Sequence, residues 1–89
     1  MIYDAEWHRQ FVDQLGFNIR SQRRRVGISQ RELGIRASLD RTLISMHERG
    51  ARVPRTDTLV RIAGSLDIRP GVLLDGLEWL PAVAEEIYS

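Results

Sequence analysis

The 89-residue sequence predicts an all-α fold, a compact domain of five helices with an extension at each end. Three observations support this class. Apolar residues recur every three or four positions, as they do on one face of an α-helix. Residues that favour helix starts precede several of these segments, and glycine or proline follows them. The alternation of apolar and polar residues that is typical of half-buried strands is missing.

The first helix is expected over residues 4–25. Phe11, Leu15 and Ile19 recur at four-residue intervals and mark its buried face. Gly27 then ends the helix, because glycine adopts the left-handed conformation of a C-terminal cap without strain.

Two short helices follow almost without a break. Ser29 and Glu32 form the S-x-x-E pattern of a capping box, which starts the second helix. That helix ends near Ala37, and Asp40 is a good N-cap for the third, which Gly50 ends. The connection between them is therefore only three or four residues long.

The fourth helix is expected over residues 56–66, where Leu59, Ile62 and Leu66 keep helical spacing. Pro70 suits the first position of a short fifth helix over residues 70–77. Pro81 breaks the pattern, and residues 82–89 form either a short helix or a frayed tail.

The charge of the chain is concentrated in its middle. The net charge is only +1, but residues 20–55 carry ten arginines against three acidic residues, while both ends are acidic. Such a basic centre favours a polyanionic partner. A solvated, salt-bridged surface is the alternative explanation. All 13 basic residues are arginine, which suits phosphates and guanine edges but also fits the codon bias of a GC-rich genome.

Other classes of protein are disfavoured. Cysteine is absent, which excludes disulfides and thiolate metal sites. No apolar run approaches the ~20 residues of a membrane-spanning helix, and the N-terminus lacks the features of a signal peptide. We therefore expect a cytoplasmic protein without membrane contact. The only histidines, His8 and His47, do not have metal-ligand spacing, so neither a cofactor nor enzymatic activity is expected.

Two helices joined so closely cannot lie antiparallel and must cross steeply, as in a helix-turn-helix. The ordered set "GISQRELGIRASLDRTLIS", "ERG" and "VPRTDTLVRIAGSLDI" is specific. On these segments, residues 15–74 resemble the Cro/repressor type of helix-turn-helix domain, also called the xenobiotic-response-element (XRE) family. The resemblance implies a DNA-binding transcription regulator whose third helix, residues 40–49, enters the major groove.

The resemblance also assigns roles to individual residues. The positions implied to contact bases are Arg41, Thr42, Ser45 and Met46, and those implied to contact the DNA backbone are Gln30, Arg49 and Arg52. We also expect backbone contacts from Ser29 and Arg31, and for Arg31 the alternative is a diffuse positive field without a specific contact. Arg23 and Glu48 fall where the family often has a structural ion pair. For Arg41 the alternative is a surface arginine without a base contact.

Several residues depart from the family pattern. Ser38 stands where the turn usually has glycine, so it carries strain unless another residue takes the left-handed conformation. His47 replaces an apolar residue and is expected to be half-buried and neutral, with one hydrogen bond. Arg55 replaces the usual serine cap of the fourth helix, so Thr56 is a candidate cap instead.

We divide the chain into an N-terminal extension over residues 1–14, the DNA-binding domain over 15–77 and an acidic extension over 78–89. The ends contain more large apolar residues than such a domain needs inside, which favours a homodimer on a near-palindromic operator. The residues expected at its interface are Trp7, Val72, Leu73, Leu77, Trp79 and Leu80. The rival reading is a protein-interaction adaptor or an antitoxin that acts mainly through a protein partner.

Overall fold

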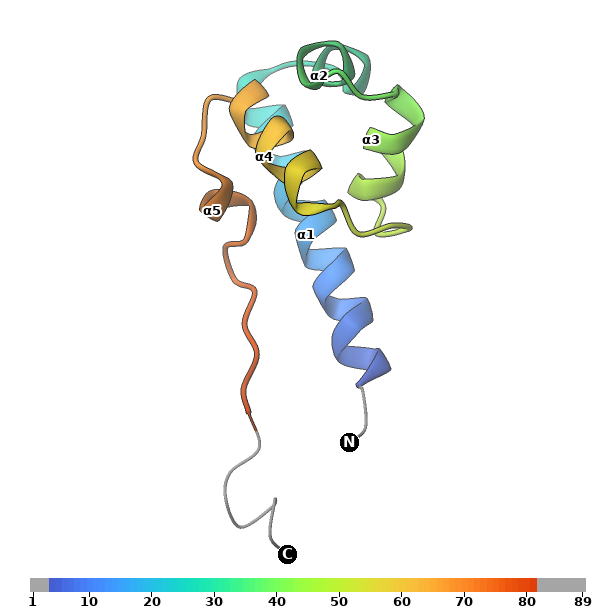
Figure 1. Cartoon of the computed structure of the whole chain (residues 1–89), viewed down its shortest axis with the longest axis vertical. Coiled ribbons are helices and arrows are strands. Elements are labelled where there is room, and N and C mark those ends of the chain that lie inside the picture. The colour runs from blue at the N-terminus through green and yellow to red at the C-terminus, as the bar shows by residue number, and fades with distance from the viewer. Residues whose placement is uncertain (1–3, 82–89) are drawn as a thin grey trace, which may run out of the picture.

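The computed structural model describes residues 4–81, and these form five α-helices and no strand. The helices are α1 (Ala5–Val26), α2 (Gln30–Ala37), α3 (Arg41–Glu48), α4 (Thr56–Ser65) and α5 (Pro70–Leu73). The long α1 runs through the molecule, with α2 across one end, α3 and α5 on opposite sides, and α4 between them (Figure 1). The all-α prediction is confirmed, and among these residues no helix is long and apolar enough to cross a membrane.

The caps predicted at Gly27, Ser29 and Asp40 are all present, and Asp4 caps the start of α1. The Asp4 carboxylate accepts a hydrogen bond from the Trp7 amide, and Gly27 ends α1 with φ of 81°. The Ser29 hydroxyl accepts from the Glu32 amide at the start of α2, and the Asp40 carboxylate accepts from the Thr42 amide at the start of α3. These short polar side chains satisfy amides that have no partner inside the helix.

The turn between α2 and α3 is strained at Ser38, which has φ of 55° and takes the left-handed conformation itself. Its cost is about 1 kcal/mol or more for a residue with a Cβ atom. Gly34 makes the tight turn sterically possible, because a Cβ at this position would lie 2.7 Å from the Leu39 carbonyl oxygen.

The later helices differ from the expected boundaries. Arg55 occupies the N-cap of α4 without a capping hydrogen bond, and Thr56 is already helical, so the predicted shift of the cap to Thr56 was wrong. α5 ends at Leu73 instead of near residue 77. The Asn18 amide of α1 donates to the carbonyl oxygens of Leu73 and Asp75, at 3.0 and 2.8 Å, and holds the chain in a turn there. The helix or tail expected over residues 82–89 lies outside the described residues.

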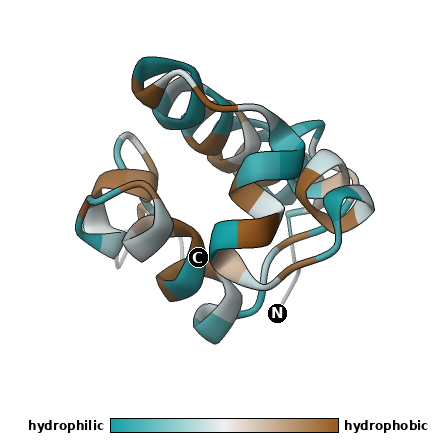
Figure 2. Ribbon diagram, turned by 90° about the horizontal axis from the view of Figure 1, so that it is seen from above, coloured by the Kyte–Doolittle hydropathy of each residue, from teal (hydrophilic) through white to brown (hydrophobic). Residues whose placement is uncertain are grey.

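The core draws on every helix. Figure 2 shows hydrophobic and hydrophilic bands alternating along the helices, as expected when each buries one face. The buried cluster consists of Leu15, Ile19, Leu33, Ile44, Leu59, Ile62, Ala63, Leu66 and Leu73. Leu73 is completely buried in this cluster. Its assignment to a dimer interface is therefore corrected, because its side chain has no surface to offer another molecule.

Two helical glycines provide a matched test of the packing of α1 against α3. A Cβ at Gly16 would lie 2.5 and 2.6 Å from the carbonyl oxygens of His47 and Glu48, whereas a Cβ at Gly64 would meet nothing within 4 Å. We expect Gly16→Ala to lower the free energy of unfolding by about 1–3 kcal/mol or more, because backbone atoms would have to move. Gly64→Ala should raise it by up to about 1 kcal/mol, because alanine favours the helix. Urea denaturation of both variants measures this difference, and equal effects would contradict the close approach of α1 and α3.

Candidate nucleic-acid interface

The helix α3 has one buried face and one face open to solvent. Ile44, His47 and Glu48 are buried against the rest of the domain. On the opposite face, Arg41 and Thr42 are exposed in the first turn. The Asp40 cap fixes the start of α3 just before them. The N-terminal half of α3 is thus the half that is free to meet another molecule.

The other two residues predicted to contact bases are less exposed to solvent. Ser45 is partly exposed and lies one helical turn beyond Arg41, on the same face. Met46 is also only partly exposed.

A shallow polar hollow lies between the start of α2 and the open face of α3. It has a volume of about 190 Å³ and is lined by Gln30, Arg41, Thr42, Ser45 and Arg49. Its lining therefore joins three of the predicted base-contacting residues to two of the predicted backbone-contacting residues. The structure brings these five side chains together although Gln30 and Arg49 are 19 positions apart in the sequence. Met46 is not among the residues that line the hollow.

The remaining predicted backbone contacts do not line this hollow. Ser29, Arg31 and Arg52 are exposed. The Ser29 hydroxyl already caps α2, so its neighbouring backbone amides are the groups that remain to bind an anion. Within residues 4–81, neither Arg41, Arg49 nor Arg52 forms an ion pair, so their charges are not neutralised there.

A buried ion pair holds the C-terminal end of α3 in place. The Arg23 guanidinium donates to both carboxylate oxygens of Glu48, with nitrogen–oxygen distances of 2.6 and 2.9 Å, and also donates to the Ile28 carbonyl oxygen at 2.8 Å. The Glu48 side chain is only 3% exposed. The hydrogen bond to Glu48 raises the pKa of Arg23 above its ordinary value although burial acts in the opposite direction. Arg23 therefore keeps its charge, and the two side chains join α1 to α3.

Gln30 takes part in the same network. Its side-chain nitrogen lies 3.2 Å from a carboxylate oxygen of Glu48. The sequence suggested only a phosphate contact for this residue and did not indicate the link to Glu48. One amide hydrogen is used in the link, which leaves the second hydrogen and the carbonyl oxygen for a ligand. The contact therefore holds Gln30 at the edge of the hollow.

Arg61 stabilises the helix-turn-helix from the outside, a role that the sequence did not reveal. From α4, its guanidinium donates to the carbonyl oxygens of Ala37 and Ser38, at 2.9 and 2.5 Å. These oxygens lie at the C-terminal end of α2, where the helix dipole favours a positive charge. Arg61 thus supports the strained turn that sets the angle between α2 and α3.

His47 is buried more deeply than expected, with 2% of its surface exposed. Its Nδ1 atom lies 2.8 Å from the Arg52 carbonyl oxygen. Because a carbonyl oxygen only accepts, Nδ1 carries the proton and donates in this hydrogen bond. This hydrogen bond connects the loop that contains Arg52 to the last turn of α3. Within residues 4–81, no group of three potential ligand side chains that could hold a metal ion is found.

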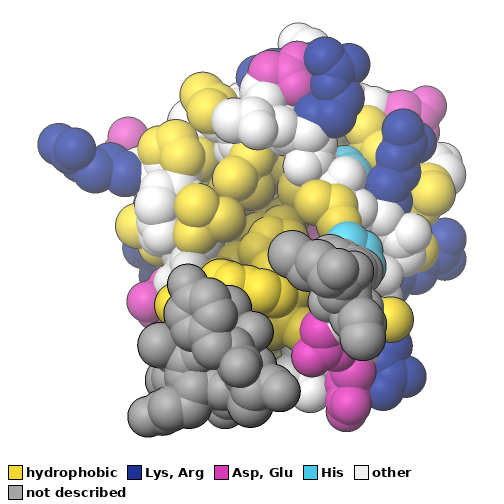
Figure 3. Space-filling model, turned by 60° about the horizontal axis from the view of Figure 1, so that its bottom comes forward, with side chains coloured by type: hydrophobic (Ala, Val, Ile, Leu, Met, Phe, Trp, Pro, Cys, Tyr) yellow, Lys and Arg dark blue, Asp and Glu magenta, His cyan; other side chains and the backbone are white. Residues whose placement is uncertain are grey.

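Of the apolar residues predicted for dimerisation, Trp7 lies on the first half of α1, Val72 on α5, and Leu77, Trp79 and Leu80 on the segment after α5. The first half of α1 and the segment after α5 both extend away from α2 (Figure 1). Figure 3 looks onto the end of the molecule away from α2 and shows a broad hydrophobic area with arginines around its edge. Val72, Trp79 and Leu80 are exposed, and Trp7 and Leu77 are partly exposed. Leu74, which the sequence reading did not single out, is also exposed, at 41%.

Comparison with known proteins agrees with this geometry. The helix-turn-helix domain family matches residues 14–77. A solved structure, the restriction-modification controller protein C.AhdI from Aeromonas hydrophila, is 32% identical in sequence with a TM-score of 0.69. The similarity covers 70% of this chain and 94% of that protein. No match is found among curated proteins.

The fold and the open face of α3 define a helix-turn-helix protein that binds DNA and regulates transcription. The chain belongs to the helix-turn-helix domain family, in its Cro/repressor or XRE type. The resemblance found in the sequence is thereby confirmed.

Proposed function

We propose that this protein binds a near-palindromic operator as a homodimer and places α3 of each copy in the major groove. The observation that supports the proposal most directly is the polar hollow beside the open face of α3. Its residues combine side chains suited to base edges with side chains suited to phosphates. The similarity to a restriction-modification controller favours a controller of this kind, without enzymatic activity of its own.

In this proposal, Arg41 is the principal base-reading residue. It follows the Asp40 cap directly, is exposed, and has no ion pair within residues 4–81. An arginine at the start of a recognition helix forms two hydrogen bonds with the O6 and N7 atoms of guanine. Thr42 and Ser45 contact neighbouring bases, and Met46 meets the edge of a thymine methyl group.

Contacts with the DNA backbone hold α3 in register. Gln30 and the free amides beside Ser29 bind one phosphate at the start of α2, where the helix dipole favours an anion. Arg31, Arg49 and Arg52 contribute positive charge around the groove. These contacts increase affinity for any duplex but carry no sequence information.

A single recognition helix reads only a few base pairs, so discrimination requires a second copy. We propose that the copies meet through apolar residues of α5 and of the segment after it, with Val72, Leu77, Trp79 and Leu80 in contact and Trp7 packed behind them. Leu74 belongs to the same surface. Two-fold symmetry would then place the two α3 helices about one helical turn of DNA apart.

Selection of bound duplexes from a random pool, at a low and a high salt concentration, tests this function. We expect a palindromic sequence whose half-sites are about one helical turn apart. Its affinity should fall with salt at a logarithmic slope of about −0.9 for each neutralised phosphate. Sedimentation of the same sample should show a dimer at micromolar concentration or on DNA. Recovery of duplexes without a common sequence would contradict specific regulation, and a monomer on and off DNA would contradict the dimer.

A further inference from the structure

A pocket apart from the open face of α3 lies between the first half of α1 and the segment that follows α5. It has a volume of about 400 Å³, which falls in the range of about 300–1,000 Å³ typical of small-molecule sites. We propose that this pocket binds a small organic cation. The contacts proposed between α3 and DNA do not use this pocket, although Trp7, Trp79 and Leu80 also belong to the proposed dimer surface.

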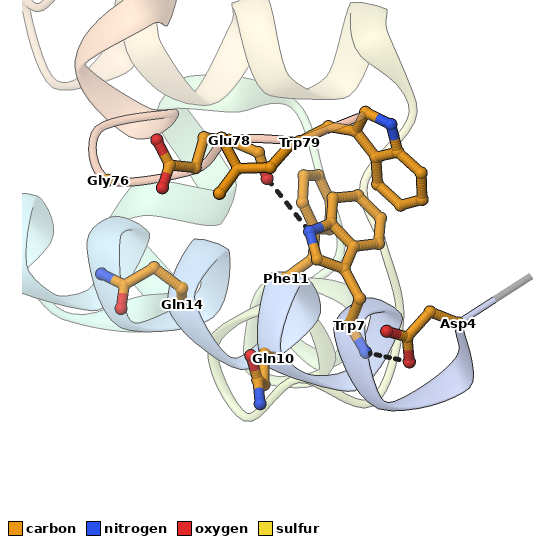
Figure 4. Close-up of a pocket in the computed structure, with 9 residues that line it drawn as sticks. Asp4, Trp7, Gln10, Phe11, Gln14, Gly76, Glu78 and Trp79 are labelled. Atoms are coloured by element: carbon orange, nitrogen blue, oxygen red, sulfur yellow. Dashed lines mark hydrogen bonds between the residues drawn. The ribbon is translucent and has the colours of Figure 1, made fainter. Parts of the chain in front are cut away.

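Aromatic rings form the centre of the pocket. Trp7 and Phe11 project from α1 with ring centroids 5.3 Å apart, and Trp79 meets Trp7 edge-on at 4.9 Å. The indole nitrogen of Trp7 donates to the Glu78 carbonyl oxygen at 3.0 Å, which fixes both walls of the pocket relative to each other (Figure 4). Aromatic faces attract cations, and tryptophan does so most strongly.

The charged residues of the pocket favour a ligand with a positive charge. Its lining contains two carboxylates, Asp4 and Glu78, and no arginine or histidine. In the view of Figure 4, the Glu78 carboxylate lies near Gly76, and Asp4 lies on the opposite side of the aromatic rings. The N-terminus of α1 also lies here, and its partial positive charge opposes a cation. Asp4 caps that terminus, so Glu78 is the residue left to pair with the ligand.

The remaining lining also suits a polar organic molecule. Gln10 and Gln14 line the pocket from α1. The Gln14 side chain donates to Asn18 at 2.9 Å, which positions its carbonyl oxygen as an acceptor for hydrogen-bond donors on the ligand. A metal ion does not fit this site, because within residues 4–81 no three potential ligand side chains gather. The combination of aromatic faces, one free carboxylate and amide groups matches an ammonium or quaternary ammonium compound.

A second copy of the chain is the other candidate occupant, because Trp7, Trp79 and Leu80 also belong to the proposed dimer surface. The two carboxylates favour the cation, since a second copy that brought its own Asp4 and Glu78 into this pocket would place like charges together. A partner's side chain in the pocket would exclude a small cation, whereas an empty pocket at the dimer surface would accept it. A cation-binding assay therefore separates these cases.

The two tryptophans of the chain both line this pocket, so tryptophan emission is sensitive to its occupancy. We expect choline to change the tryptophan emission saturably in the millimolar range. Its neutral isostere 3,3-dimethylbutan-1-ol, in which a carbon atom replaces the charged nitrogen, should bind roughly two- to tenfold more weakly. Equal responses to the two compounds, or no saturable response to choline, would overturn the proposal.

Two matched variants identify the residue that pairs with the cation. Glu78→Gln keeps the shape of an exposed side chain and should weaken choline binding roughly two- to tenfold, toward the affinity of the neutral isostere. Glu6→Gln removes the same charge from an exposed residue of α1 that does not line the pocket, and should leave binding unchanged. Equal effects of the two changes would show that only the overall charge matters and would contradict a built site. Operator binding is measured separately, so failure of one proposal does not affect the other.

Discussion

Glu48→Gln is expected to lower the free energy of unfolding by about 3–5 kcal/mol, which is the usual cost of removing one partner of a buried ion pair. The amide keeps the volume of the side chain, so the effect isolates the lost charge. Arg23 would be left with its positive charge and little water, because its side chain is only 11% exposed. Gln30 would lose its charged partner at the same time. Urea denaturation followed by circular dichroism measures the change.

Two further variants make this result interpretable. Glu32→Ala breaks an exposed pair with Arg36, whose side chains are 44% and 42% exposed, and should cost at most about 1 kcal/mol. If Glu48→Gln does not fold, the double variant Arg23→Met, Glu48→Leu should recover much of the stability, because it removes both charges and keeps apolar volume. A change below about 1 kcal/mol for Glu48→Gln would refute a structural role for the pair.

The double variant Arg41→Ala, Thr42→Ala is expected to lose specific operator binding roughly ten- to a hundredfold while remaining folded. Both side chains are exposed, and Asp40 caps the backbone amide of residue 42 whichever side chain is there. The free energy of unfolding should therefore change by no more than about 0.5 kcal/mol. Binding to a random duplex should weaken only slightly, because one positive charge is lost.

Arg69→Ala is the control for that lost charge. Arg69 is exposed and precedes α5, which lies on the other side of the molecule from α3 (Figure 1). We expect its operator binding to stay close to that of the unchanged protein. If Arg69→Ala loses specific binding as strongly as the double variant, the loss in the double variant comes from its lower positive charge and not from base recognition. An adaptor that does not use DNA would be indifferent to both changes.

The sequence predicted those parts of the fold that depend on neighbouring residues. The caps at Ser29 and Asp40 and the end of α1 at Gly27 involve residues within one or two turns of each other. Local spacing also predicted the buried faces of α1 and α4. These features follow from the period of the helix and from the chemistry of its ends.

The features that escaped prediction depend on residues far apart in the chain. Asn18 stops α5 early through contacts 55 and 57 positions away. Arg61 braces the turn at Ser38 from 23 positions away. Leu73 was expected on the surface because it belongs to an apolar run, but packing selected it for the core. No local pattern distinguishes the core member of such a run from its exposed neighbours.

For the candidate site, the sequence again predicted part of the arrangement and missed the rest. The ion pair of Arg23 with Glu48 was implied by the family resemblance and is present in the structure. The grouping of Gln30 with the open face of α3 required the crossing of α2 and α3. Which bases and phosphates these residues contact remains a prediction.

The central claim is that Arg41 reads guanine in the major groove. Replacing guanine by 7-deazaguanine, one position at a time in the selected operator, tests it directly, because this analogue lacks the N7 acceptor and leaves base pairing intact. At one guanine in each half-site, we expect the substitution to weaken the unchanged protein roughly tenfold and to have no effect on Arg41→Ala. If no guanine gives this difference between the two proteins, α3 does not read the operator through Arg41.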